Sequence, residues 1–191
     1  MILGRDAILE YLESGAIVCT PRPDENQIQG TSIDVRLGHN FWIQKVSWYG
    51  AERLVDKDLP GPWYQPVVVE DPNSYFYLEP SNTVLAHTEE FIGTTVPWLT
   101  TKIHTRSTPA RWGVDVCKGA GFGDPGFCGR WTLELTNTTP WTIALPIGCR
   151  IAQIAFFEVK GNESDLYDRM YNQGPDEWTP NHMLPKLLQR D

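Results

Sequence analysis

Short apolar stretches separated by turn residues dominate this 191-residue chain from Gly30 onward. Proline, glycine and asparagine interrupt them at intervals that leave room for strands but not for long helices. The apolar or alternating stretches are 33–37, 41–44, 75–78, 84–87, 131–135, 141–145 and 150–159. Many short strands with frequent turn signals are typical of a β-sandwich or a β-barrel. We therefore predict a mainly β fold.

The two ends of the chain depart from this pattern. Near the N-terminus, apolar residues recur at helical spacing, at Leu3, Ala7, Ile8, Tyr11 and Leu12. This spacing predicts a short helix, which Gly15 can end in a left-handed cap. Residues 161–191 are polar, contain proline and show no clear period, so we expect an extended tail. Without an internal repeat or a linker, residues 1–191 are predicted to form one domain.

Composition excludes several classes of function. The net charge of −8 argues against a nucleic-acid binder, because phosphate contacts require a basic face. No apolar run approaches the roughly twenty residues of a membrane span. The four cysteines are scattered without a CxxC pair, and acids stand where a signal peptide needs a basic flank. We therefore expect a reduced, cytoplasmic protein that does not bind a membrane.

Residues that can do chemistry are concentrated between Arg106 and Asn137, in RSTPARWGVDVCKGAGFGDPGFCGRWTLELTN. Arginines and loop amides can hold phosphates, an aspartate can bind a sugar hydroxyl and a glutamate can move a proton. This combination predicts a nucleoside triphosphate site.

Two other chemistries fit the sequence less well. His87, Thr88 and Glu89 match half of the zinc deaminase signature, but the PCxxC half is absent, and Cys117 and Cys128 are separated by residues 118–127. Without two nearby thiolates the zinc shell cannot close, so we predict no zinc. Ser107 has a histidine three residues before it but no G-x-S-x-G turn, so a hydroxyl that binds phosphate or orients water is favoured over a nucleophile.

Glu134 is the candidate acid–base residue. In the stretch 131–135 it shares one face of the strand with Thr132 and Thr136, while apolar residues face the opposite side. An exposed strand glutamate and a catalytic glutamate both fit this pattern, so the spacing alone leaves the choice open.

The motifs of the chain resemble those of the dCTP deaminase and dUTPase superfamily, and within it the dCTP deaminase branch. The matching segments, in order, are SIDVRLG (32–38), RSTPARWG (106–113), AGFGDPGFCG (120–129), TLEL (132–135) and GCRIAQIAFF (148–157). The resemblance implies a distorted, dUTPase-like β-barrel that assembles as a homotrimer with active sites between subunits. It also implies that the tail, 161–191, closes over the nucleotide.

The implied reaction is the zinc-independent hydrolytic deamination of dCTP to dUTP and ammonia. By resemblance, Glu134 activates a water to attack carbon 4 of cytosine and passes the proton to the leaving ammonia. Ser107 and the backbone of Ala120 orient that water, and Arg111 supports the charged glutamate and the transition state. Magnesium enters with the triphosphate.

The resemblance also implies how the nucleotide is held. Arg106, Ser107 and Thr108 contact the triphosphate, Asp124 takes the 3′-hydroxyl of the deoxyribose and Phe127 packs near the sugar. The other implied binding residues are Phe122, Thr132, Leu133, Gln153, Tyr167, Arg169 and Gln173.

Several positions bear on the subtype. Gln153 and the sequence Ala120-Gly121-Phe122 also fit members that cleave the resulting dUTP to dUMP and pyrophosphate, so this bifunctional activity is an alternative. A catalytically silent, nucleotide-binding regulatory trimer is a further one. Gly119 stands where many members have a threonine linked to feedback inhibition, so inhibition by dTTP is left open. Gly123 replaces a usual isoleucine, which indicates a looser base pocket.

Overall fold

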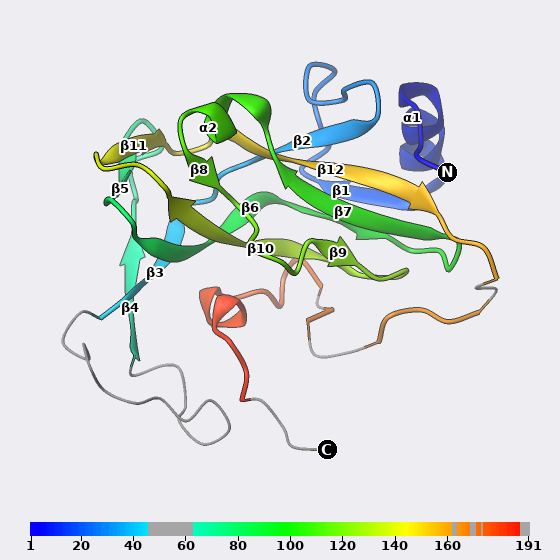
Figure 1. Ribbon diagram of the computed structural model, residues 1–191. Coiled ribbons are helices and arrows are strands. Elements are labelled where there is room, and N and C mark those ends of the chain that lie inside the picture. The colour runs from blue at the N-terminus through cyan, green and yellow to red at the C-terminus, as the bar shows by residue number, and fades with distance from the viewer. Residues whose placement is uncertain (46–62, 162–163, 169–170, 173, 188–191) are drawn as a thin grey trace.

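The computed structural model describes residues 1–45, 63–161, 164–168, 171–172 and 174–187 (Figure 1). Short strands make up most of it, joined by tight turns. The helical elements are α1 (Arg5–Ser14), α2 (Ser107–Arg111) and the 3₁₀ turn η3 (Pro180–Met183). The strands are β1 (Ile17–Thr20), β2 (Ser32–Arg36), β3 (Asn40–Gln44), β4 (Tyr64–Val68), β5 (Tyr75–Leu78), β6 (Thr83–Thr94), β7 (Leu99–Thr105), β8 (Val114–Asp115), β9 (Phe122–Gly123), β10 (Cys128–Asn137), β11 (Ile143–Pro146) and β12 (Arg150–Glu158).

The described strands form two larger sheets and one separate antiparallel pair. One sheet has the order β4-β3-β6-β10-β8, with β1 also paired to β6, and the other has the order β2-β12-β7-β9. The pair β11-β5 forms a third, two-stranded sheet. Side chains from both larger sheets, such as Ile33, Leu133 and Ile154, belong to one buried apolar core. The predicted mainly β fold with a short N-terminal helix is confirmed, and the described strands form open sheets rather than a closed barrel.

The N-terminal helix ends as its sequence predicts. Gly15 follows α1 with φ 79°, a left-handed conformation that glycine adopts without a steric penalty. Leu3 and Ile8 are buried in the core, which explains the helical spacing of apolar residues. None of the helices in the described ranges is long and apolar enough to cross a membrane.

Strand β10 carries the acid–base candidate. Leu133 and Leu135 are fully buried on its core side, while Thr132, Glu134 and Thr136 lie on the other side, as the alternation predicts. The register with β6 shifts between Arg130 and Thr132, so β10 has an irregularity immediately before the Thr132–Glu134 segment. Such irregularities re-aim neighbouring side chains and are frequent next to functional sites.

Some elements were not predicted from the sequence. Strand β7 reads LTTKIHT, and its buried Thr101 hides the apolar alternation of Leu99 and Ile103. Strand β6 extends well beyond the expected 84–87 because polar residues such as Glu90 are buried within it. The predicted stretch 141–145 begins as a strand only at Ile143.

The tail is less extended than expected. Its last turn, η3, lies against β3 and β6, below β10 in the view of Figure 1. The indole of Trp42 donates a hydrogen bond to the carbonyl of Pro180 over 2.8 Å, and Met183 is buried. The tail therefore docks by apolar contacts that its mostly polar composition conceals.

Candidate active site

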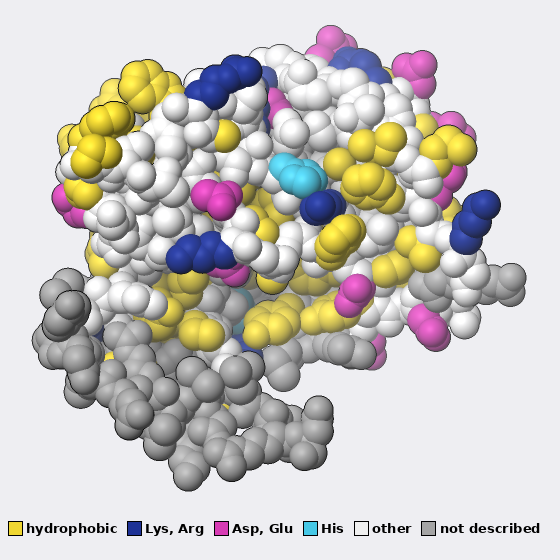
Figure 2. Space-filling view, viewed as in Figure 1, with side chains coloured by type: hydrophobic (Ala, Val, Ile, Leu, Met, Phe, Trp, Pro, Cys, Tyr) yellow, Lys and Arg dark blue, Asp and Glu magenta, His cyan; other side chains and the backbone are white. Residues whose placement is uncertain are grey.

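A cavity of about 830 Å³ lies between β10, the segment 120–130 and the tail. Its volume is within the range of ~300–1,000 Å³ that small-molecule sites occupy. Hydrophobic side chains follow a hollow below the main body in Figure 2. Seven of the predicted site residues line the cavity: Ala120, Phe122, Asp124, Phe127, Thr132, Glu134 and Tyr167. The structure thus brings the proposed acid–base, sugar and base contacts into one place.

The carboxylate of Glu134 is half-buried and held by the loop that follows β8. The backbone N–H of Lys118 donates to its Oε2 over 2.8 Å, and the N–H of Glu134 donates to the carbonyl of Val116 over 2.9 Å. The ammonium of Lys118 donates to Thr83 Oγ1 on β6 over 2.8 Å, and that hydroxyl lies 3.0 Å from Thr136 Oγ1 on β10. These bonds tie the loop to both strands and fix the direction of the carboxylate.

A tight turn presents Asp124 and Phe127 to the cavity. The N–H of Phe127 donates to the carbonyl of Asp124 over 2.9 Å, and Gly126 within the turn has φ 88°. The turn is pinned to β6, because the N–H of Thr94 donates to the carbonyl of Phe127 over 3.2 Å. Asp124 itself is exposed, so its carboxylate is accessible to a ligand hydroxyl.

Gly123 does not loosen the pocket as its sequence position indicated. A Cβ at this position would lie 2.4 Å from Thr101 Oγ1 and 2.7 Å from the indole of Trp131. These distances are far below van der Waals contact, so the ring of Trp131 already occupies the space that a side chain at residue 123 would need. The expectation of a roomier pocket at this position is therefore wrong.

The described part of the tail closes one side of the cavity. The N–H of Tyr167 donates to the carbonyl of Pro125 over 2.7 Å, and the N–H of Cys128 donates to Asn172 Oδ1 over 3.2 Å. Farther along, the ring of Trp178 lies 4.5 Å from that of His87 and 5.6 Å from the guanidinium of Arg130. Arg169 and Gln173, expected over the phosphates, lie outside the described residues.

His87 is buried in β6 with both ring nitrogens in hydrogen bonds. Burial lowers its pKa to about 4. Its Nδ1–H donates a hydrogen bond to the carbonyl of Thr88 over 2.8 Å, and its Nε2 accepts a hydrogen bond from the N–H of Asn40 over 3.3 Å. Within the described ranges, no group of three or more His, Cys, Asp or Glu side chains is arranged to hold a metal ion.

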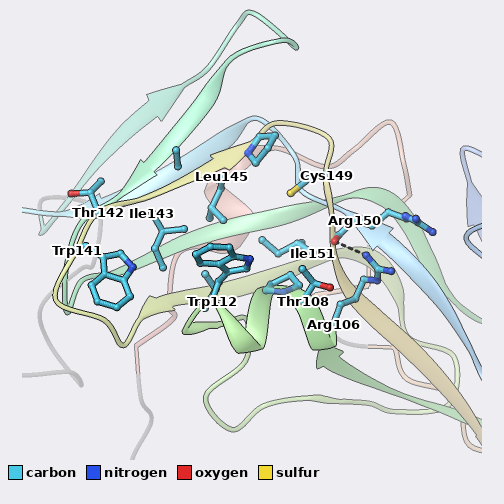
Figure 3. Close-up of a pocket in the computed structure, with 14 residues that line it drawn as sticks. Arg106, Thr108, Trp112, Trp141, Thr142, Ile143, Leu145, Cys149, Arg150 and Ile151 are labelled. Atoms are coloured by element: carbon cyan, nitrogen blue, oxygen red, sulfur yellow. Dashed lines mark hydrogen bonds between the residues drawn. The ribbon is translucent and has the colours of Figure 1, made fainter.

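Two of the predicted phosphate residues, Arg106 and Thr108, lie in a separate groove of about 450 Å³ (Figure 3). Arg106 and Thr108 line it beside the exposed rings of Trp112 and Trp141. Together with Tyr75 and Tyr77, these rings form an exposed aromatic group at the corner of β5 and β11, where Figure 2 shows hydrophobic side chains gathered.

Arg106 is held at the edge of this groove by a buried carboxylate. Its Nε lies 2.9 Å from Asp34 Oδ2, and Arg150 Nη1 lies 3.3 Å from the same oxygen. Arg106 Nη1 also donates to the carbonyl of Arg150 over 3.2 Å, the dashed line in Figure 3. Burial raises the pKa of Asp34, while Arg106 and Arg150 oppose that rise. Part of the guanidinium of Arg106 is thus committed to protein contacts.

The remaining predicted residues are not brought to the cavity within one chain. Ser107 and Arg111 are exposed on α2, outside the described lining of either space. Gln153 lies on β12 between Asp34 of β2 and His104 of β7. The side chain of Leu133 points into the core, so only its backbone could face a base. The sequence-based site is therefore divided between two surfaces of the protomer.

Several cavity residues escaped the sequence reasoning. They are Tyr64, Leu85, Arg130, Tyr171, Trp178, His182, Met183, Leu184 and Lys186. The one available signal was the apolar content of WTPNHMLP (178–185) in an otherwise polar tail. Its contact with a strand more than ninety positions earlier in the chain could not be read from periodicity.

Comparison with known proteins identifies the family. A model of the family described as dCTP deaminase-like matches residues 2–159. The chain belongs to the dCTP deaminase-like family. It is 37% identical over 170 residues to the "dCTP deaminase, dUMP-forming" of Dictyoglomus thermophilum, a match that covers 87% of this chain and 85% of that protein. It is 35% identical over 162 residues to the "dCTP deaminase" of Haloarcula marismortui, covering 84% and 82%.

Solved structures support the fold assignment. The crystal structure of a 2′-deoxycytidine 5′-triphosphate deaminase from Agrobacterium tumefaciens aligns with a TM-score of 0.60 at 19% identity. The alignment covers 81% of this chain and 47% of that one. At this identity the likeness establishes that the dCTP deaminase-like chain shares its fold, and nothing more.

Proposed function

We propose that this protein deaminates dCTP and then hydrolyses the dUTP formed, releasing ammonia, dUMP and pyrophosphate. The observation that carries the proposal is a half-buried carboxylate, Glu134, held by the Lys118 amide in the same cavity as Asp124 and Phe127. The relatives from Dictyoglomus thermophilum and Methanobrevibacter smithii, both 37% identical, carry the name "dUMP-forming", which favours the bifunctional reaction over simple deamination.

In the proposed first step, Glu134 removes a proton from a water that attacks carbon 4 of cytosine. The same carboxyl then delivers the proton to the exocyclic amine, which leaves as ammonia, so that one water converts dCTP to dUTP. The backbone of Ala120, at the rim of the cavity, helps to orient that water. In the second step, another water cleaves the bond between the α- and β-phosphates, giving dUMP and pyrophosphate.

The nucleotide is proposed to bind with its sugar at the turn 124–127. The exposed carboxylate of Asp124 accepts a hydrogen bond from the 3′-hydroxyl, and the ring of Phe127 packs on the deoxyribose. Thr132 and the neighbouring backbone of β10 face the base. The tail, including the segment around Tyr167, belongs to the same single domain and closes the cavity over the nucleotide. Exclusion of water then strengthens the electrostatic interactions inside the cavity.

The triphosphate requires more positive charge than the described cavity supplies. Arg130 and Lys186 line the cavity, but Asp124 and Glu134 carry the opposite charge within it. We therefore propose a homotrimer in which α2 of a neighbouring subunit brings further cationic and hydroxyl groups, Arg106, Ser107, Thr108 and Arg111, to each site. The exposed rings around the groove fit an interface, since exposed apolar patches on a protomer commonly mark association surfaces.

Product analysis tests the proposed function. Purified protein is incubated with dCTP and magnesium, and nucleotides are separated by anion exchange while ammonia and pyrophosphate are assayed separately. We expect equimolar ammonia and pyrophosphate, with dUMP as the nucleotide product. Glu134→Gln keeps the shape of the side chain but cannot take a proton, so it should abolish ammonia release while leaving the thermal unfolding temperature close to that of the wild type. Sustained deamination by this variant would refute the mechanism.

Simple deamination is the second candidate. The Haloarcula marismortui relative, at 35% identity, is named only "dCTP deaminase". Accumulation of dUTP with ammonia but without pyrophosphate would establish this reaction instead. Tight binding of dCTP without either product would favour the silent regulatory protein.

A further inference from the structure

We propose that Trp131 is a positioning residue that sets the orientation of Phe127 and, through it, the docking of the tail at Tyr167. The inference rests on the proposed function in one respect only, namely that Phe127 packs on the sugar of the bound nucleotide. It concerns a side chain to which the proposed chemistry assigns no role.

The backbone and indole of Trp131 are fixed by the protein itself. At the irregularity in β10, the N–H of Trp131 donates to the side-chain Oγ1 of Thr88 on β6 over 2.9 Å, in place of a regular backbone pairing with that strand. The indole Nε1 donates to the carbonyl of Ile92 over 3.2 Å, and the side chain is only 5% exposed. Because its one donor is already used, the indole has no hydrogen bond of its own to offer a ligand.

The space that the ring occupies is made by the absence of a side chain at Gly123. A Cβ there would lie 2.7 and 2.8 Å from two atoms of the six-membered ring of Trp131. The pair Gly123 and Trp131 is thus a reciprocal fit, in which the large side chain stands on β10 and the small one on β9. The ring is thereby placed directly under the turn that carries Phe127.

Three aromatic rings then form a column from the core to the tail. The rings of Trp131 and Phe127 meet edge to face at 5.1 Å and 88°, and those of Phe127 and Tyr167 meet at 5.7 Å and 81°. Edge-to-face pairs at such separations are attractive and directional. Tyr167 is also attached to the turn itself, through its N–H on the carbonyl of Pro125.

The turn that carries Phe127 packs closely against the tail. At Gly126, which has φ 88°, a Cβ would lie 2.9 Å from the backbone N of Tyr167, so tail and turn are in close contact. A change in the ring below is therefore transmitted to Phe127 and to the tail rather than absorbed by the turn. It follows that Trp131 controls two functions at once, sugar packing and closure.

A matched pair of variants separates positioning from simple filling of the core. Trp131→Leu and Trp131→Phe both reduce the volume and remove the Nε1 hydrogen bond, but only phenylalanine keeps a ring for Phe127. We expect Trp131→Leu to raise the KM for dCTP about 2- to 12-fold, the range of one edge-to-face pair, with a smaller change in kcat. Trp131→Phe should retain most of the affinity. Trp98→Leu, at an exposed position outside the cavity, serves as the control with wild-type kinetics.

Two readouts complete the test. Dissociation constants for dCTP are measured in the Glu134→Gln background, where no turnover occurs, and hydrogen exchange is followed in peptides that contain Tyr167. Trp131→Leu should weaken binding and accelerate exchange, while Trp131→Phe should do neither. Equal effects of the two variants on affinity and exchange would overturn the proposal. If Trp131→Leu fails to fold, Phe127→Leu breaks the same column and should accelerate exchange at Tyr167. If the protein does not bind dCTP at all, the proposed function fails, but the exchange measurement still decides the link between Trp131 and the tail.

Discussion

Replacement of His87 by glutamine should reduce the loss of unfolding free energy that the protein shows as the pH falls. The neutral imidazole has both nitrogens satisfied: Nδ1 donates to the carbonyl of Thr88, and Nε2 accepts from the N–H of Asn40. The ring also packs on Gly38, where a Cβ would lie 2.1 Å from Cε1, and under Trp178. A proton on Nε2 would therefore point at the N–H of Asn40, which is itself a donor, in a buried site.

The size of the effect follows from the pKa. Burial is the largest cause that lowers the pKa of His87 from 6.5 to about 4, with the nearby charges of Arg130 and His39 acting in the same direction. The unfolded chain takes up the proton near pH 6.5, whereas the folded chain resists it until about pH 4. The stability contributed by the neutral ring is thus complete above pH 6.5 and is lost as the pH falls to about 4, by about 3 kcal/mol.

Urea unfolding followed by tryptophan fluorescence measures this loss. Wild type and His87→Gln are compared between pH 8 and pH 4.5 at one protein concentration, because association would otherwise shift the apparent stability. We expect the wild type to lose about 3 kcal/mol more than the variant over that interval. Asp34, whose pKa is raised by burial, contributes the opposite slope, but it is present in both proteins and cancels in the difference. Parallel profiles for the two proteins would refute the reasoning.

Two further predictions concern assembly and closure. Ser107→Ala and Glu134→Gln should each be inactive alone, yet refolding an equimolar mixture should restore about a quarter of wild-type activity if each site takes Ser107 from one subunit and Glu134 from another; no recovery in refolded trimers would contradict a shared site. Met183→Ala removes a buried side chain that anchors the tail, at a cost of ~2–5 kcal/mol. It should expose the tail to limited proteolysis and raise the ratio of dUTP to dUMP released. Met183→Leu, which conserves volume, should behave as wild type, and an unchanged product ratio in Met183→Ala would count against retention of dUTP by the tail.

The sequence was most informative where neighbouring residues decide the structure. The face of Glu134 on β10 follows from strict alternation, and the end of α1 follows from Gly15. The resemblance carried the family and seven of the residues that line the cavity. In these cases each feature depends on residues within a few positions of one another, which is the range over which periodicity and capping act.

What the sequence did not predict depends on contacts between distant segments. The pairing of Asp34 with Arg106 and Arg150 joins three strands or their ends. The local sequence RSTPARWG therefore could not indicate that Arg106 is held by Asp34. The replacement of a usual isoleucine by Gly123 indicated a larger base pocket, because the sequence does not show that the ring of Trp131, on another strand, fills the space. Likewise, no local signal placed Trp178 against His87.

The anchoring of the tail links the two proposed hydrolytic steps. Its described contacts beyond residue 173 are mainly to apolar or neutral groups, with Met183 buried, Trp178 on His87 and Pro180 on the indole of Trp42, and the ring of Trp178 also lies near the guanidinium of Arg130. Closure by such contacts does not depend on the exocyclic amine of the base, so in the proposed reaction the cavity can remain shut after the amine has left. A dUTP molecule that stays enclosed meets the second water before it can dissociate, and release of dUMP and pyrophosphate follows. The partition between dUTP and dUMP therefore depends on how fast the tail opens relative to the second hydrolysis, and the apolar anchor favours dUMP.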